Sequence, residues 1–156
     1  RPPAGRPLPE GYHARELRDA DDWEQAVGKE LAEAGSPSDP AYEEFVRRRV
    51  DSRRRMVSNG DAAFMGVFLG DRLVADLGIV LCAGPARYQS VGTDPAHRGR
   101  GLASHLLHMA GEWAEDRGAT RWVIVADRGS DAARLYRRCG LRPAAHSWQV
   151  YRTGET

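Results

Sequence analysis

The sequence lacks long hydrophobic runs and a strong net charge, and it has few cysteines and lysines. No apolar stretch approaches the roughly eighteen residues that a membrane-spanning helix needs, so nothing in it supports a membrane role. The formal net charge is only +1, and the charge of the whole chain therefore does not indicate a nucleic-acid partner. Lys29 is the only lysine among 23 basic residues, which we attribute to codon usage rather than to chemistry.

The two cysteines, Cys82 and Cys139, fit no metal-ligand spacing. We expect both thiols to be buried in a cytoplasmic protein, because nothing at the N-terminus resembles the hydrophobic region of a secretory signal. His105 and His108 lie one helical turn apart, but no third ligand is spaced with them. The sequence therefore predicts no metal site.

The composition is that of one soluble globular domain, with 156 residues of which 41% are hydrophobic and 29% charged. Residues 1–10 contain four prolines and almost nothing to bury, so we expect an extended, disordered tail. Residues 11–156 then form a single domain without repeats or linkers. The chain does not begin with methionine, which is compatible with an additional domain in a longer chain, and a homodimer is compatible with the sequence as well.

Hydrophobic periodicity and turn residues predict an alternation of strands and helices. After a short strand over 12–17, two helices begin at Asp19 and at Asp39-Pro40, the second with a buried stripe of Tyr42, Phe45, Val46, Val50 and Val57. A hairpin with strands 62–70 and 72–82 follows. The remaining elements are a strand over 87–93, a helix over 101–117, a strand over 121–127 buried on both faces, a helix from Ser130 to Gly140 and a last strand over 146–152. A strand, helix, strand order predicts a parallel crossover, so the sheet is mixed.

The segment HRGRGLAS, residues 97–104, carries the strongest functional signal and is termed the phosphate loop. It joins a strand to a helix N-terminus, where four backbone N–H groups lack helical partners and attract anions. Gly99 and Gly101 let a phosphate approach closely, and Arg98 and Arg100 add positive charge. A third glycine, needed for a dinucleotide-binding motif, is missing, and so is the Gly-Lys pair of a P-loop. The residues therefore predict a diphosphate site of another kind.

Residues 98–103, RGRGLA, match the Arg/Gln-x-x-Gly-x-Gly/Ala motif of the GNAT superfamily, the acyl-CoA-dependent N-acyltransferases. The segment ARLYRRCGL, residues 133–141, resembles the second signature of that family, and the order of elements over 12–152 is similar too. The resemblance implies an α+β fold in three layers (αβα), whose mixed, mostly antiparallel sheet contains a parallel pair of strands that splay apart. It also implies acetyl-CoA as the cosubstrate and no metal.

By this resemblance, acetyl-CoA would lie where the strand ending at Thr93 splays from the strand ending at Ala126. Backbone groups around Val91 and Thr93 would pair with the pantetheine arm and polarise the thioester carbonyl. Tyr136 matches the family tyrosine that protonates the leaving thiolate. The diphosphate would bind the turn formed by Arg98, Gly99, Arg100, Gly101, Leu102, Ala103 and Ser104.

Two departures from the family pattern leave roles open. Gly129 stands where the family often has an asparagine that contacts the cofactor, and Asp127 and Arg128 are candidates to replace it. The strand before the phosphate loop contains no glutamate, the family's usual general base. Asp76, Asp127, His146 and water remain candidates for that base.

A run of arginines, RRRVDSRRR, resembles a nucleic-acid-binding patch. Acidic residues four positions before Arg47, Arg48 and Arg55 indicate instead a solvated helix face with many ion pairs. In the GNAT family this helix borders the acceptor side of the cleft. Arg47, Arg49 and Arg53 are therefore candidates to recognise an acidic group on the acceptor.

The sequence thus predicts an N-acetyltransferase that transfers the acetyl group of acetyl-CoA to a primary amine of a small molecule or a peptide N-terminus, by direct attack in a ternary complex. A GNAT-like module that binds acyl-CoA without transfer is the first alternative. A nucleic-acid-binding protein is the second. A thiol-release assay with a panel of amines separates transfer from binding, and salt-sensitive DNA binding identifies the last alternative.

Overall fold

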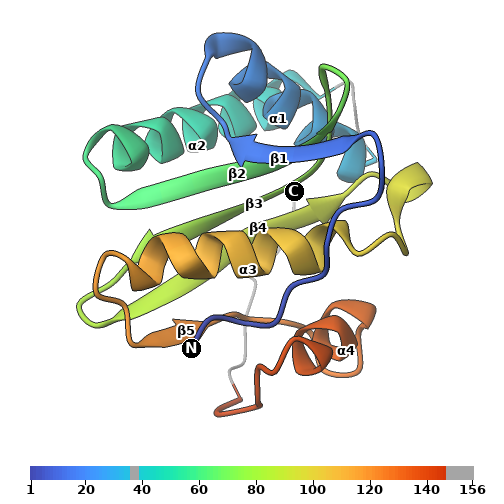
Figure 1. The fold of residues 1–156 in the computed structure, drawn as a ribbon. Helices are drawn as coiled ribbons and strands as arrows, with labels where there is room; N and C mark the ends of the chain where they lie inside the picture. Colours follow the sequence, from blue (N-terminus) through green and yellow to red (C-terminus); the bar gives the residue numbers. More distant parts are fainter. Residues whose placement is uncertain (36–38, 147–156) are drawn as a thin grey trace, which may run out of the picture.

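The computed structural model describes residues 1–35 and 39–146, and Figure 1 shows how they fold. The strands of the sheet lie side by side in chain order: β1 (Tyr12–Glu16), β2 (Ala62–Leu69), β3 (Arg72–Leu81), β4 (Pro85–Thr93) and β5 (Arg121–Val123). The pairings from β1 to β4 are antiparallel, whereas β4 and β5 pair in parallel. The predicted mixed sheet is confirmed.

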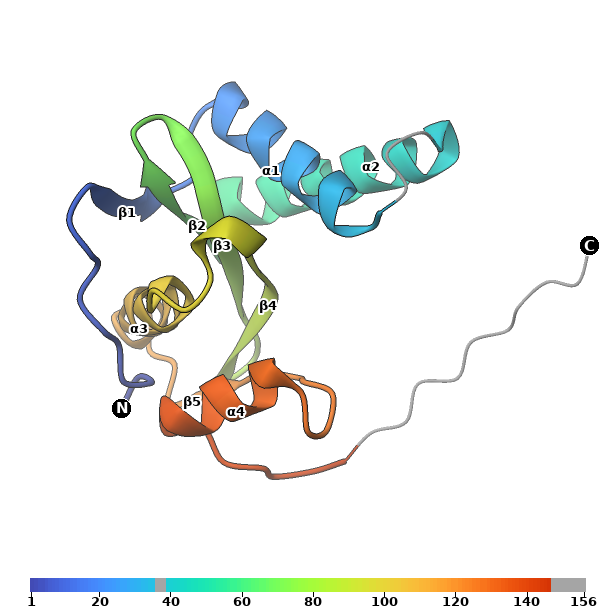
Figure 2. The same ribbon diagram turned by 90° about the vertical axis from the view of Figure 1, so that its right-hand side faces the viewer.

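Helices cover both faces of the sheet (Figure 2). On one face lie α1 (Ala20–Glu33) and α2 (Pro40–Ser58), and on the other lies α3 (Leu102–Glu115). The helical turn η1 (Pro95–His97) precedes α3, and α4 (Asp131–Arg138) follows β5. The predicted α+β architecture in three layers is confirmed.

The central hairpin of β2 and β3 is buried because its side chains alternate between two hydrophobic cores. From β2, Ala63, Met65 and Val67 belong to the core beneath α3, whereas Phe64 and Phe68 belong to the core beneath α1 and α2. Every residue of β2 except the last is buried. This double burial explains why the strand reads as a continuous apolar run although its neighbours are antiparallel.

The helix starts follow the predicted capping residues. Asp19, Asp39 and Ser130 cap α1, α2 and α4, each accepting a hydrogen bond from a backbone N–H two or three residues further on, at 2.9, 2.9 and 3.1 Å. The backbone of these helix starts is therefore satisfied within the protein. The helix α3 differs in this respect.

Some expectations about burial are wrong. Phe45 is 50% exposed, because it lies beside the buried stripe of α2 and packs against an arginine of the next turn. The strand β5 is shorter than predicted and not buried on both faces: Val123 and Val125 are 40% and 57% exposed, since β5 is an edge strand that leaves β4 after three paired residues. Cys82 is exposed just after β3, whereas Cys139 is buried.

The last predicted strand, over 146–152, lies outside the described residues except for its first residue. Within residues 1–35 and 39–146, no helix combines the length and the apolar character that crossing a membrane requires.

The N-terminal segment (residues 1–10) is extended, but it packs on the domain, which differs from the disordered tail expected (Figure 1). Pro3 is buried, and its carbonyl oxygen accepts a hydrogen bond from His108 Nδ1 on α3 at 3.0 Å. The backbone N–H of Ala4 donates to the carbonyl oxygen of Cys139 at 2.8 Å. Because prolines restrict the unfolded chain, few contacts suffice to hold such a segment in place.

Candidate active site

A β-bulge interrupts the pairing of β3 with β4. Between the pairs Asp76–Gly92 and Gly78–Gln89, β4 contains one residue more than β3. Ser90 in this interval has a φ of 55°, a left-handed conformation that residues other than glycine rarely adopt. A bulge leaves backbone groups outside the hydrogen-bonded ladder. Backbone groups of β4 are therefore available to a ligand at this point.

The strands β4 and β5 separate beyond the pair Arg87–Val123, while β4 continues to Thr93. Beside the end of β4 lies the long groove, a cavity of about 1440 Å³ lined by residues 4–6, α1, the start of β3, the end of β4, the start of α3 and α4. The structure brings most of the predicted site residues into the walls of this groove: Val91, Thr93, Arg98, Gly99, Gly101, Leu102, Ala103, Ser104 and Tyr136.

The N-terminus of α3 lies in the wall of the long groove. Its N-cap is Gly101, and no side chain within residues 1–35 and 39–146 caps it, in contrast to α1, α2 and α4. The first N–H groups of α3 therefore lack a side-chain partner and carry the partial positive charge of the helix end. Gly101 has a φ of 81°, and a Cβ there would lie 3.4 Å from the side chain of Arg6. The turn fits an anionic group that approaches the backbone closely.

Of the three arginines near the start of α3, two line the long groove and one does not. Arg98 lines the long groove, and its Nε donates a hydrogen bond to the carbonyl oxygen of Thr93 at 3.2 Å. Arg100 is exposed and is not among the residues that line the groove. Arg6 does line it, and its carbonyl oxygen accepts a hydrogen bond from His105 Nδ1 at 2.9 Å, which holds the N-terminal segment against α3.

Tyr136 reaches the long groove from α4 and is 7% exposed. Burial raises the pKa of its phenol, so the hydroxyl is protonated at neutral pH and able to donate a hydrogen bond. Tyr88 on β4 is buried as well, but its hydroxyl donates to the carbonyl oxygen of Leu107 at 2.6 Å. Of these two buried tyrosines, Tyr136 is the one placed to act on a ligand in the groove.

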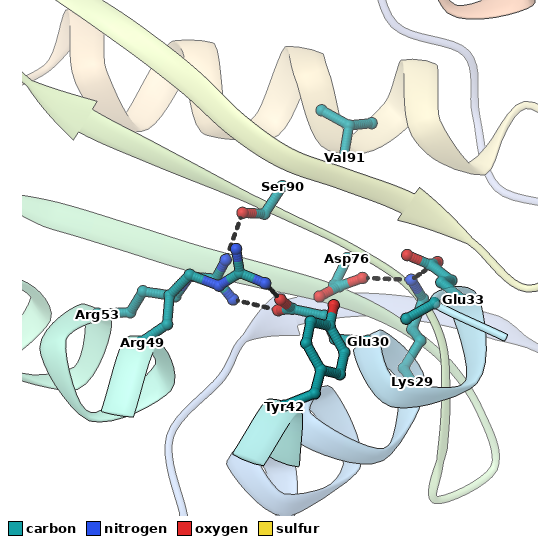
Figure 3. A pocket seen from close by; sticks show the side chains of 10 residues that line it. Lys29, Glu30, Glu33, Tyr42, Arg49, Arg53, Asp76, Ser90 and Val91 are labelled. Carbon is teal, nitrogen blue, oxygen red and sulfur yellow. Dashed lines mark hydrogen bonds and ion pairs between the residues drawn. The ribbon is translucent and has the colours of Figure 1, made fainter. Parts of the chain in front are cut away.

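A second cavity, the small pocket, has a volume of about 380 Å³ and lies between the sheet and the helices α1 and α2 (Figure 3). Its size suits a small molecule. Val91, Lys29 and Glu33 line both cavities, so the long groove and the small pocket meet at the bulge of β4. Among the residues that the structure describes, the lining of the small pocket is Lys29, Glu30, Glu33, Ala34, Tyr42, Arg49, Arg53, Asp76, Ser90 and Val91.

A lysine between two carboxylates marks the place where the cavities meet. Lys29 Nζ lies 2.8 Å from Asp76 Oδ1 and 2.6 Å from Glu33 Oε1. The lysine rests against Gly92, where a Cβ would collide with its Nζ. Burial raises the pKa of Asp76, although Lys29 opposes this effect. Burial also disfavours the charged form of Lys29, but the two carboxylates outweigh it and the pKa of Lys29 is raised.

Two arginines of α2 share one carboxylate in the small pocket. Arg53 is 8% exposed and donates to Glu30 Oε2 at 2.9 Å and to Ser90 Oγ at 2.7 Å. Arg49 also pairs with Glu30. Burial lowers the pKa of both guanidinium groups, and the nearby Arg53 lowers that of Arg49 further. Asp76 has a favourable charge interaction with Arg53, whereas Glu30 is the ion-pair partner of both arginines.

Several residues singled out in the sequence do not reach either cavity. Asp127 and His146 are exposed and line neither one, so Asp76 is the proposed base that the structure places beside the bulge. Arg47 pairs with exposed glutamates of α1 and α2 and does not line the small pocket. Ion pairing along this face of α2 agrees with the solvated helix face predicted for the arginine run.

Sequence reasoning missed the contribution of α1 to the site. Lys29, Glu30 and Glu33 were not candidates, although a single lysine one helical turn before a glutamate is a usable signal. It also missed Arg6, because nothing in a proline-rich stretch indicates where it packs. In residues 1–35 and 39–146, no group of three or more His, Cys, Asp and Glu side chains is arranged to hold a metal ion.

Comparison with known proteins identifies the family of the chain. The model of the acetyltransferase (GNAT) family matches residues 21–141, most of the chain. The chain therefore belongs to the GNAT acetyltransferase family, and this membership supports an acyltransferase activity. A comparison with curated proteins finds no match.

Solved acetyltransferase structures have the same fold. A glucosamine-6-phosphate N-acetyltransferase from Arabidopsis thaliana superposes with a TM-score of 0.70 at 15% identity, over 91% of this chain and 99% of that one. A ribosomal-protein-alanine N-acetyltransferase from Brucella melitensis gives 0.66 at 19% identity, over 92% and 99%. A predicted acetyltransferase with acetyl-CoA from Clostridium acetobutylicum gives 0.69 at 14% identity, over 90% and 96%. At such identities the likeness shows the fold alone.

Proposed function

We propose that the protein is an N-acetyltransferase that transfers the acetyl group of acetyl-CoA to a primary amine of a small molecule or a peptide N-terminus. The observation that carries the proposal is that the long groove and the small pocket meet at Val91, on the bulge of β4. A donor in the groove and an acceptor in the pocket would have their reactive ends side by side. Direct attack in a ternary complex then needs only correct positioning of the two.

On the donor side, the residues present suit an acyl-CoA. The uncapped N–H groups of α3 and the glycines of the phosphate loop would hold the diphosphate, with positive charge from Arg98, Arg100 and Arg6. Backbone groups at Val91 and Thr93 would pair with the pantetheine arm. When bound, acetyl-CoA supplies an activated thioester, and the backbone dipoles at the bulge stabilise negative charge that develops on its carbonyl oxygen.

On the acceptor side, we assign Asp76 as the general base. Its carboxylate lies in the small pocket beside the bulge, and burial raises its pKa above that of an ordinary carboxyl, which makes it a stronger base. Lys29 holds the carboxylate in place at 2.8 Å. Asp76 takes the proton that the acceptor nitrogen loses, directly or through water.

Tyr136 acts on the departing sulfur. The acceptor nitrogen forms a bond to the carbonyl carbon, and the carbon–sulfur bond breaks with its electron pair on sulfur. Tyr136 donates a proton to that sulfur and regains one from solvent, while Asp76 releases its proton to solvent. No nucleophile of the protein is required, and burial raises the pKa of the Cys139 thiol, which keeps it unreactive.

The substitution Tyr136→Phe tests this assignment, because it removes the proton donor and keeps the ring. We expect turnover, measured as thiol release with a panel of amines, to fall about 10²-fold. The dissociation constant for acetyl-CoA, measured by calorimetry, should change less than about twofold, since the hydroxyl acts on the leaving group.

The matched control is Tyr88→Phe, whose hydroxyl bonds within the core and should affect stability but not turnover of the folded protein. Unchanged turnover in Tyr136→Phe would remove Tyr136 from the mechanism. Acetyl-CoA binding without thiol release for any amine would indicate a binding module, and no binding at all would reject the proposal.

A further inference from the structure

The arginine end of the small pocket carries more positive than negative charge. Among the described residues, two guanidinium groups, Arg49 and Arg53, form ion pairs with a single carboxylate, Glu30, whereas Asp76 acts on Arg53 through space and pairs with Lys29. Counted by ion pairs, this end has a formal surplus of one positive charge. Figure 3 shows the two arginines converging on Glu30 below Ser90. The Ser90 hydroxyl, at 2.7 Å from Arg53, is the other polar partner at this end.

The opposite end of the pocket has the reverse balance. Lys29 faces Asp76 and Glu33, so one ammonium group meets two carboxylates and a formal surplus of one negative charge remains. This end adjoins Val91, where the long groove begins. Figure 3 shows Arg49 and Arg53 on one side, Lys29 and Glu33 on the other, and Asp76 between them. A ligand that fills about 380 Å³ would contact both ends.

Other arginines of α2 show that this imbalance is a local feature of the pocket. Arg47, outside the pocket, pairs with two carboxylates, those of Glu24 and Glu43, both at 2.8 Å. In such exposed pairs, each charge is stabilised both by its partner and by water. In the pocket, by contrast, the half-buried Arg49 and the buried Arg53 share one ion-pair partner, Glu30, and Asp76 adds a favourable charge near Arg53. Burial of incompletely paired charge is costly.

We propose that the acceptor is a small amine that also carries an anionic group, a carboxylate or a phosphate, and that Arg49 and Arg53 bind this group while the amine lies beside Asp76. The inference rests on the proposed function and adds the substrate class to it. Guanidinium groups bind carboxylates and phosphates with paired hydrogen bonds, and Arg49, which is half-buried, is accessible to them. An anion there would give Arg49 a second partner, and its charge would oppose the repulsion by which the neighbouring Arg53 lowers the pKa of Arg49.

The test compares amines that differ only in the anionic group. Suitable pairs are short ω-amino carboxylates with their amides, and aminoalkyl phosphates with the corresponding amino alcohols. For the wild-type protein we expect kcat/KM to be at least about tenfold higher for one anionic series than for its neutral partners. The series that is preferred identifies the anion as a carboxylate or as a phosphate.

Arg49→Gln should reduce this preference about tenfold, and the matched control Arg47→Gln, on the same helix but outside the pocket, should leave it unchanged. Glu30→Gln should act in the opposite direction and tighten binding of the anionic amine, because it removes the competing carboxylate. Calorimetric titration of the preferred anionic amine into the protein with CoA present gives the dissociation constants without turnover.

Equal rates on charged and neutral amines, or a preference that Arg49→Gln and Glu30→Gln both leave unchanged, would overturn the inference while the acetyltransferase activity stands. Loss of preference in Arg47→Gln as well would also count against it, since the effect would then come from the overall charge of α2. If no amine is acetylated, the proposed function fails. Calorimetric titration of each anionic amine and its neutral partner then still decides the inference, which requires Arg49→Gln to weaken and Glu30→Gln to tighten binding of an anionic amine.

Discussion

The two cavities that meet at the bulge of β4 are lined by different kinds of chemical groups. The phosphate-loop wall of the long groove comes from one short stretch of chain, and its main features are glycines, uncapped backbone N–H groups and the exposed Arg98. The small pocket is lined mainly by charged side chains from α1, α2 and β3, which are partly buried and joined by ion pairs, and β4 adds Ser90 and Val91. The groove is therefore suited to a ligand that backbone groups recognise, and the pocket to one that a few side chains select.

The contrast extends to electrostatics. Exposed arginines such as Arg98 and Arg6 act through solvent, so their effect on an anionic ligand is weak individually and decreases with salt. The ion pairs of Lys29 and Arg53 lie in a less polar environment, where removal of one partner leaves the other charge unpaired. Substitutions of charged residues in the small pocket should consequently change activity more than substitutions of single charged residues in the long groove change CoA affinity.

The largest effect is expected from Asp76→Asn, which removes the proposed base. We expect kcat/KM for the acceptor to fall by about 10²-fold or more, while acetyl-CoA affinity is retained. Burial raises the pKa of the wild-type carboxyl above its ordinary value near 3.9, against the opposing charges of Lys29 and Arg53 and with the help of Glu33. Activity of the wild type should therefore be lost on acidification at a higher pH than an ordinary carboxyl would give.

A pH profile of kcat/KM checks this prediction, and the acidic limb should disappear in Asp76→Asn. The control is Asp116→Asn, an exposed position at the end of α3. If the acidic limb persists in Asp76→Asn, the base is another group. The expectation that changes in the small pocket have the larger effects would then lose its main support.

An intermediate effect is expected from Gly101→Ala in the groove. The new Cβ would stand where the diphosphate approaches the backbone, and we expect the dissociation constant for CoA to rise about tenfold. Gly60→Ala is a matched control, because its φ of 80° is nearly the same as the 81° of Gly101 but it lies in the turn between α2 and β2. Both variants should lose similar stability from backbone strain, by thermal unfolding, and only Gly101→Ala should lose CoA affinity. Equal CoA affinity in the two would show that this turn does not contact the ligand.

The smallest effect is expected from Arg6→Ala, which removes one exposed charge from the groove. We expect CoA to bind about two- to fivefold more weakly at low salt, with the difference shrinking as salt is added. Arg1→Ala, in the same N-terminal segment but outside the groove, is the control. Calorimetry with CoA and with pantetheine, which has no phosphate, separates a charge effect from a general one. A loss of pantetheine affinity would indicate that Arg6 holds the segment in place instead.

The same contrast explains what could be predicted from the sequence. The helix caps at Asp19 and Asp39, the hairpin around residues 70–71 and the phosphate loop are short-range features, in which neighbouring residues determine the backbone. The small pocket is different, because Lys29 of α1 meets Asp76 of β3 only through the packing of a helix on the sheet. Periodicity places Lys29 on a helix but does not determine which strand it faces.

The errors have the same physical origin. Phe45 has the right residue type for the buried stripe of α2, but its position beside the stripe depends on how α2 lies on the sheet. The segment over 121–127 reads as a buried strand, yet the strand ends at Val123 because β4 and β5 diverge there. The N-terminal segment looks disordered by composition, although a few hydrogen bonds to α3 and to Cys139 hold it. In each case burial or local structure depends on a tertiary contact, which the local sequence does not reveal.

The single lysine has a practical consequence for biochemical work. Lys29 has a side chain that is 11% exposed, and its ammonium group is held between two carboxylates, so almost none of it is in the neutral form that reacts with electrophiles. Amine-directed dyes, cross-linkers and surface-coupling chemistry will therefore modify this side chain poorly. Thiol-directed reagents at Cys82, which is exposed, offer the better route for attaching a probe.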